Sequence, residues 1–180
     1  MNFFDHNFRE IFFSQVVSIA GGLIAGLALA FYTDRLLLIP GLFVILPGFL
    51  EMRGNISGSF ASRLSSGLFL KVIDAGRINT RLIRSNLVAS FALAIIVSMV
   101  LGVLALAFNY FVSGVFLWKI VLLPLLAGII ANAIEIPLAL MATFYLFHIG
   151  HDPNNIIGPF LTTTGDIVSI FALLIALVVI

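Results

Sequence analysis

Long apolar stretches with almost no charge are the feature of this sequence that most restricts its fold. Charged residues make up 9% of the 180 residues, whereas hydrophobic residues make up 62%. A soluble domain carries about 25% charged residues, because its surface faces water. This chain cannot cover a water-facing surface in that way. Its composition therefore predicts a protein that lies within a lipid bilayer.

Five segments are long enough to cross a bilayer as helices, each of which needs about 20 mostly apolar residues. The predicted spans are residues 11–32, 36–70, 87–112, 118–147 and 156–180. The second would reach roughly 50 Å as one straight helix, so we expect it to be bent or broken. Candidate positions are Pro40, Pro47, Gly48 and Gly54. Pro124 and Pro137 interrupt the fourth span. The sequence thus predicts an all-α, polytopic membrane protein with a single domain over residues 1–180.

Basic residues gather on one side of these spans. Four of them lie in the linker between the second and third spans: Lys71, Arg77, Arg81 and Arg84. Arg9 falls on the same side, whereas Arg35 and Lys119 fall on the other. Basic loops favour the cytoplasm, so we expect a cell-membrane protein with a cytoplasmic N-terminus and an external C-terminus. We also expect the linker to contact anionic lipid. The first span should be retained rather than cleaved as a signal peptide, since Asp5 and Glu10 interrupt its basic region.

Small residues recur at every fourth position in three spans. The three sets are Ser18, Gly22, Gly26 and Ala30; Gly54, Gly58, Ser62 and Ser66; and Ala94, Ser98 and Gly102. Such faces let the backbones of membrane helices approach closely. We therefore expect them to mediate helix packing, and we assign them no chemistry.

Two acidic residues fall deep within the predicted spans. Asp166 lies near the middle of the fifth span, and Glu135 lies well inside the fourth. Intramembrane charges are costly and by default mark a functional site. The third to fifth spans contain no basic residue at that depth, and Arg63 is one candidate partner from the second span. We expect Asp166 to lack an arginine cap, so that a metal ion balances its charge.

Oxygen-bearing side chains surround Asp166. Thr162 lies on its helical face, Thr163 lies beside it, and we expect residues 152–159 to form a distorted helix start with free carbonyls. In the second span, Asn55 offers an amide oxygen. Hard cations such as Mg²⁺ prefer oxygen ligands. Glu135 is equally consistent with a structural hydrogen-bonded acid and with a cation or proton site.

The remaining polar residues give weaker signals. Glu51 and Arg53 could neutralise one another or extend toward the interface. His6, His148 and His151 are interpreted as interfacial residues, because no pair has the i,i+4 spacing of a helical zinc site. We find no nucleophile–base pair, phosphate loop or nucleic-acid patch, so we expect neither an enzyme nor a nucleic-acid partner.

Two motifs resemble those of the MgtE family, especially its eukaryotic solute-carrier branch. The first is Leu-Pro-Gly-Phe-Leu-Glu-Met-Arg-Gly-Asn at residues 46–55, followed by Ala-Ser-Arg-Leu-Ser-Ser at residues 61–66. The second is Asp-Pro-Asn-Asn at 152–155, followed by Gly-Pro at 158–159, Thr-Thr at 162–163 and Gly-Asp at 165–166. The motifs occur in the family's order, and with the five spans the resemblance covers essentially the whole chain.

The resemblance implies a magnesium or divalent-cation channel or transporter with an MgtE-type transmembrane domain. In that family five-helix units work in pairs, with the ion path along their interface. Asp166 matches the family's pore aspartate, and Asn55 matches its glycine-asparagine position. We expect this protein to differ from bacterial relatives in lacking their cytoplasmic sensor domains, and from the eukaryotic branch in having one five-helix unit rather than two. Gating by those domains therefore cannot be carried over.

We therefore expect a homodimer that passes Mg²⁺, or alternatively Mn²⁺, Co²⁺ or Ca²⁺, along its twofold axis. The candidate metal ligands are Asp166, Asn55, Thr162, Thr163 and Glu135. One alternative is an exchanger in which Glu135 carries H⁺ or Na⁺ against the divalent ion. Another is a non-transporting membrane assembly protein, in which both acids only join helices.

Overall fold

The computed structural model describes residues 6–37 and 41–180, and the described residues form helices joined by short connections. The helices are α1 (His6–Phe31), α2 (Thr33–Leu36), α3 (Leu42–Phe69), α4 (Arg81–Ser113), α5 (Lys119–His148) and α6 (Pro153–Val179). No strand occurs in these two described ranges. The predicted all-helical fold is therefore confirmed.

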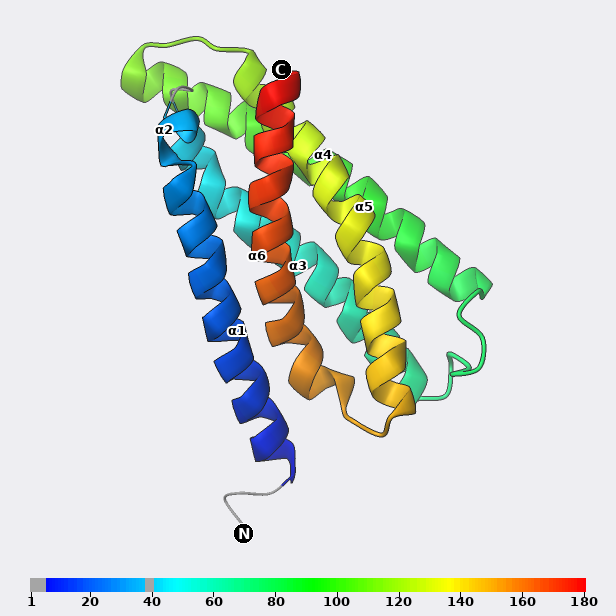
Figure 1. The fold of residues 1–180 in the computed structure, drawn as a ribbon. Coiled ribbons are helices and arrows are strands. Elements are labelled where there is room, and N and C mark those ends of the chain that lie inside the picture. Colours follow the sequence, from blue (N-terminus) through cyan, green and yellow to red (C-terminus); the bar gives the residue numbers. More distant parts are fainter. Residues whose placement is uncertain (1–5, 38–40) are drawn as a thin grey trace.

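The five long helices alternate in direction, so that the start of α1 and the end of α6 lie at opposite ends of the bundle (Figure 1). α1 packs against α6, α6 against α5, and α5 against α4, so these four helices form a row. α3 crosses this row and packs against α4, α5 and α6. The α3–α4 connection and the α5–α6 turn lie at the same end as the start of α1 (Figure 1).

The second predicted span contains one unbroken long helix. Pro47, Gly48 and Gly54 all lie inside α3 without ending it, whereas Pro40 lies outside the described residues. Membrane helices tolerate an internal proline when neighbouring groups satisfy the freed backbone. The chain turns just before α3 instead, where Gly41 has a φ of 82°, a left-handed conformation that favours glycine. α5 likewise continues through Pro124 and Pro137. The breaks expected at the internal prolines and glycines are therefore absent, whereas the long helix of the 36–70 run begins only at Leu42.

Three helices begin earlier than their apolar runs predict. α1 starts at His6, α4 at Arg81 and α6 at Pro153. The hydroxyl oxygen of Thr80 accepts a hydrogen bond from the backbone N–H of Ile83 at 3.3 Å and thereby caps α4. Capping satisfies a free N–H at a helix start regardless of hydropathy. The polar linker predicted for residues 71–86 is therefore shorter, and its last part is helical.

The start of α6 is regular, and the distortion expected over residues 152–159 is absent there. Asp152 caps the helix by accepting a hydrogen bond from the N–H of Asn154 at 2.9 Å, and a proline is well suited to the first turn that follows. Pro159 lacks an N–H, so the carbonyl of Asn155 loses its helical donor. The Ser14 hydroxyl of α1 lies 3.1 Å from that carbonyl and 2.8 Å from the carbonyl of Ile11 in its own helix, so the two carbonyls share its single hydrogen. α1 therefore supplies a shared donor at the point where α6 lacks one.

Of the three small-residue faces, the one on α4 packs as predicted. Ala94, Ser98 and Gly102 are all buried. A Cβ on Gly102 would lie 2.6 Å from the backbone oxygen of Val121 in α5. This close approach explains why a glycine occupies the contact between α4 and α5.

The other two faces differ from the prediction. On α1 the buried residues are Gly21 and Ala25, while the predicted Gly22 would meet nothing within 4 Å of an added Cβ. On α3, Gly54 and Gly58 likewise have open space around them within the described parts of the chain. None of the described residues therefore lies against an added Cβ at Gly54 or Gly58 on this face of α3.

Among the described residues, four helices are long and apolar enough to cross a membrane: α1, α4, α5 and α6. Their outer faces expose large apolar side chains, such as Phe111 at 82% and Val178 at 80%. Exposed apolar surface on this scale indicates contact with lipid. α3 is not in this set, and it carries Glu51, Arg53 and Arg63. The chain is thus a multi-pass membrane protein with four clearly apolar spans.

Candidate functional site

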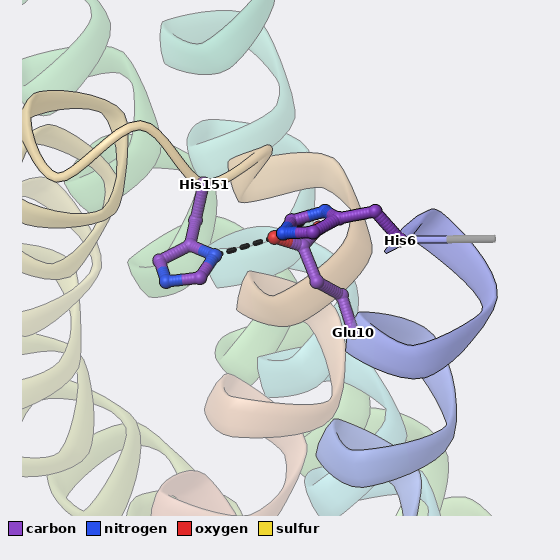
Figure 2. Close-up of side chains that lie close together, drawn as sticks. All are labelled: His6, Glu10 and His151. Carbon is purple, nitrogen blue, oxygen red and sulfur yellow. Dashed lines mark hydrogen bonds and ion pairs between the residues drawn. The ribbon is translucent and has the colours of Figure 1, made fainter.

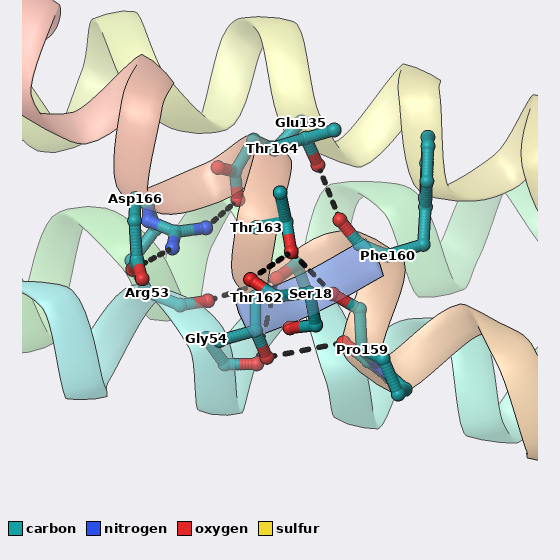
Figure 3. Close-up of polar contacts among 12 residues, drawn as sticks. Ser18, Arg53, Gly54, Glu135, Pro159, Phe160, Thr162, Thr163, Thr164 and Asp166 are labelled. Carbon is teal, nitrogen blue, oxygen red and sulfur yellow. Dashed lines mark hydrogen bonds and ion pairs between the residues drawn. The ribbon is translucent and has the colours of Figure 1, made fainter. Parts of the chain in front are cut away.

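Three charged side chains from three helices meet inside the bundle. Arg53 of α3 forms ion pairs with Glu135 of α5 and Asp166 of α6. Its Nη1 donates to Oε2 of Glu135, and its Nη2 lies 3.4 Å from Oδ1 of Asp166. Figure 3 shows the guanidinium group between the two acids. One cation therefore joins α3, α5 and α6.

The helical period explains how an arginine enters the interior. Arg53 is one turn from Phe49 and one turn from Ser57, and all three lie on the buried face of α3. Gly165 provides the space for its head group, because a Cβ there would lie 1.8 Å from Nη1 of Arg53. A longer side chain at this position and the guanidinium group could not occupy the same volume.

The charged residues lie between two apolar cores. One core includes Phe49, Ala131 and Ala172. The other includes Phe60, Ile136 and Leu161. Along α5 and α6, Glu135 and Asp166 each fall between a residue of one core and a residue of the other. The two acids therefore belong to a polar layer in the middle of the bundle, which agrees with their predicted depth within the spans.

The prediction that Asp166 lacks an arginine cap was wrong, because Arg53 contacts it. The partner comes from α3, where a pairing with Glu51 and an extension toward the interface were the two possibilities for Arg53. Glu51 instead lies on the exposed side of α3, where it accepts a hydrogen bond from Asn55 at 3.1 Å. The other candidate, Arg63, donates to the hydroxyl of Ser90 at 3.3 Å. Arg63 therefore does not pair with either acid.

The two acids differ in their access to the surroundings. The side chains of Arg53 and Glu135 are fully buried, whereas that of Asp166 is 26% exposed. The contact with Arg53 engages Oδ1 of Asp166, and Oδ2 makes no hydrogen bond to the described residues. One arginine facing two carboxylates leaves a formal charge of −1 on this cluster. Asp166 is therefore the acid that can still take a ligand.

Three further predicted ligands have different surroundings. Asn55 is exposed on α3, two positions beyond Arg53. Thr162 is exposed on α6 and donates to the carbonyl of Gly158 at 3.1 Å. Thr163 instead faces α1, and its hydroxyl lies 3.2 Å from the carbonyl of Ser18 (Figure 3). The structure thus brings Glu135 into the layer of Asp166 and directs Thr163 toward α1.

Arg53 is the site residue that was not predicted from the sequence. The available signal was its spacing from Phe49 and Ser57, which puts it on the face of α3 that carries the large apolar residues. Its immediate neighbours in the chain are Met52 and the Gly54-Asn55 pair. Glu51, two positions before Arg53, offered an ion-pair partner within the same helix, so a partner in another helix was not considered.

Comparison with known families gives a clear match. The model of the MgtE family, described as a divalent cation transporter, matches residues 46–176. This range is well over half of the chain, extends from the first part of α3 to the last part of α6, and includes Arg53, Glu135 and Asp166. A comparison with curated proteins found no match. The chain belongs to the MgtE family of divalent cation transporters.

Proposed function

We propose that this protein transports Mg²⁺, or another hard divalent cation, along a path between two copies of the chain. The observation that supports this most strongly is Asp166, a partly exposed carboxylate in the polar layer between two apolar cores. An intramembrane acid with access to its surroundings typically marks an ion path. The family match supports divalent cations as the class of substrate.

The donor atoms near Asp166 favour a hard ion. Thr162 lies one turn before it on α6 and uses its hydroxyl hydrogen on Gly158, so the lone pairs of the oxygen remain available. Asn55 adds an exposed amide on α3. Mg²⁺ usually keeps several of its waters and binds one or two carboxylates directly. Mn²⁺, Co²⁺ and Ca²⁺ accept similar ligands and are the alternatives.

Two observations support a homodimer. The cluster of Arg53, Glu135 and Asp166 carries a formal charge of −1, so two copies would balance one divalent cation. The small-residue face of α3 at Gly54 and Gly58 has open space around it, as a close contact between membrane helices requires. In this proposal α3 and α6 of each copy face the twofold axis, and α3 is the fifth membrane-spanning helix.

Arg53 changes the mechanism expected from an isolated acid. We assign it the task of holding Oδ1 of Asp166, so that Oδ2 points toward the path in a defined orientation. Glu135 is fully buried and paired with Arg53. This geometry favours the structural interpretation of Glu135 over a direct ion ligand or a proton carrier, and it weakens the exchanger alternative.

The test is Mg²⁺ flux into proteoliposomes that contain the full chain. Asp166→Asn keeps the size of the side chain and removes its charge, so we expect flux to fall at least about tenfold, as for a lost ion ligand. The matched control is Asp74→Asn, because Asp74 is an exposed acid in the α3–α4 connection. Equal flux through Asp166→Asn and the wild type would refute the assignment.

Two further readouts separate the alternatives. Flux that depends on a pH or Na⁺ gradient would favour exchange over a simple path for Mg²⁺. A purified protein that shows no flux and is not stabilised by any divalent cation would favour the assembly protein. The first result would replace the proposed ion path with an exchange mechanism. The second would replace transport with a role in membrane assembly.

A further inference from the structure

Two histidines and a glutamate converge at the end of the bundle where α1 starts. His6 and Glu10 lie one turn apart on α1, and His151 lies in the turn between α5 and α6 (Figure 2). His151 Nδ1 contacts Oε1 of Glu10, and His6 Nδ1 lies 3.4 Å from the same oxygen. The imidazole rings of His6 and His151 are stacked, with centroids 6.0 Å apart. Residues far apart in the sequence thus form one cluster.

The geometry of this cluster matches a transition-metal site. One potential ligand atom from each residue lies within 4.8 Å of the others. Zn²⁺ binds imidazole nitrogen and carboxylate oxygen at about 2.0–2.2 Å, which places tetrahedral ligands about 3.4 Å apart. A bound ion would take the place of the direct contact between Nδ1 of His151 and Oε1 of Glu10, so these two side chains would rotate apart to reach that spacing. Two histidines and one glutamate leave a fourth position for water, as in known zinc sites with an open coordination position.

A hydrogen bond from outside the cluster fixes the orientation of the Glu10 carboxylate. Its side chain is only 7% exposed, and its Oε2 accepts a hydrogen bond from Nδ2 of Asn155 at 3.0 Å. Oε1 therefore faces the two histidines. Partners of this kind orient metal-binding carboxylates and strengthen their binding. Oε1 already contacts His151 and lies near His6, so a metal ion would take the place of the imidazole protons that face this carboxylate.

The cluster is accessible from the surroundings. His6 and His151 have side chains that are 74% and 40% exposed. A groove of about 670 Å³ between α1 and α6 is lined by all three cluster residues and also by Arg9. The positive charge of Arg9 repels a cation in the groove, so the ion must be held by strong ligands. The imidazole nitrogens are the strong ligands in this cluster. This favours Zn²⁺ and related ions over Mg²⁺, which prefers oxygen ligands.

We propose that His6, Glu10 and His151 bind a transition-metal ion of the Zn²⁺ type, which fastens the start of α1 to the start of α6. The interpretation of His6 and His151 as merely interfacial missed this, because their convergence depends on the packing of α1 against α6. The site is separate from Asp166, so it stands independently of the proposed transport path.

The test is Zn²⁺ binding by the full chain in detergent micelles, without a polyhistidine tag that would bind the same ion. Isothermal titration calorimetry measures affinity, and visible absorption of bound Co²⁺ reports a tetrahedral environment. We expect His6→Ala and His151→Ala each to lower Zn²⁺ affinity at least about tenfold. The matched control is His148→Ala, because Nδ1 of His148 bonds the carbonyl of Phe144 in its own helix at 2.7 Å.

The outcomes are distinct. Support requires a single Zn²⁺ per chain, unchanged affinity in His148→Ala, and no displacement of Zn²⁺ by excess Mg²⁺. Affinity in the wild type no higher than in the double variant His6→Ala/His151→Ala would overturn the proposal. The exposed position of His6 makes His6→Ala the variant that best preserves folding, and its thermal unfolding without metal verifies this.

Discussion

Arg53 is the residue on which the interior of this protein depends most. It is fully buried and contacts Glu135 and Asp166 at once. Glu135 is also fully buried, so its charge has no access to water when the arginine is removed. A buried ion pair is expensive to break from one side, because the remaining charge is left without compensation.

Replacing this cation therefore tests the charged layer directly. We expect Arg53→Met to lower the free energy of unfolding by about 3–5 kcal/mol, measured by denaturation in mixed micelles. The control is Arg77→Met, in an exposed pair with Asp74 at 3.7 Å, where the expected loss is within about 0.5 kcal/mol. Combining Arg53→Met with Glu135→Met should recover most of the loss. Equal stability of Arg53→Met and Arg77→Met would contradict this account.

At this scale the sequence predicts part of the site. The depth of Asp166 and Glu135 within apolar segments is enough to identify both as important acids. Their partner could not be identified, because Arg53 lies 82 residues from Glu135 and 113 from Asp166. Which side chain meets an acid across helices depends on helix rotation and relative depth. Spacing within one span can indicate which face of a helix is buried, but not which residues of other helices lie opposite it at the same depth.

The contact between α4 and α5 shows how tightly neighbouring helices are fitted. At Gly102 an added Cβ would lie 2.6 Å from the backbone oxygen of Val121 and 2.8 Å from its Cα. These are main-chain atoms, so they cannot move aside without shifting the helix. A larger residue at this position must therefore separate α4 from α5.

A pair of alanine variants tests this contact. We expect Gly102→Ala to lower the free energy of unfolding by about 1–3 kcal/mol, as for other overpacked cores. Gly26→Ala is the matched control, since a Cβ there meets nothing within 4 Å and Gly26 lies outside the proposed contact between two copies. Both changes replace a glycine inside a helix, so their backbone effects are comparable. A Gly102→Ala protein as stable as Gly26→Ala in mixed micelles would argue against a close contact.

The sequence predicts well which segments form helices, but it does not predict the residues at which those helices begin and end. Apolar runs identify α1, α4, α5 and α6, because lipid-facing helices must be apolar along their length. The ends depend on local groups instead, such as the Thr80 hydroxyl at α4 and the left-handed Gly41 before α3. Internal prolines gave wrong breaks, since α3 and α5 continue through them. The rotation of α1, with Gly21 rather than Gly22 inside, was wrong by one position.

For the molecule as a whole, the alternating helices predict which connections share a side of the membrane. The α3–α4 connection carries Lys71 and Arg77, and the first turn of α4 adds Arg81 and Arg84, which favours the cytoplasm for that side. The α4–α5 connection lies at the opposite end of the bundle (Figure 1). The order of helices in the row could not be predicted from the sequence, because it depends on contacts between distant segments.

Single cysteines can test this orientation, because the chain contains no cysteine of its own. We expect Asn79→Cys, in the α3–α4 connection, to react with a membrane-impermeant maleimide only after the cells are permeabilised. Ser113→Cys, at the end of α4, should react in intact cells. The reverse pattern would indicate an inverted protein. Labelling of both from the same side would show that α4 does not cross the membrane.

The pairing of α1 with α6 has a consequence for biogenesis. α1 leaves the ribosome well before α6, and the Ser14 hydroxyl of α1 contacts the backbone of α6 where Pro159 interrupts it. A lone helix can reside in lipid because its hydrogen bonds are internal, so α1 can wait there after insertion. The contact between α1 and α6 therefore forms only once α6 has been inserted beside it, after the helices that lie between them in the chain.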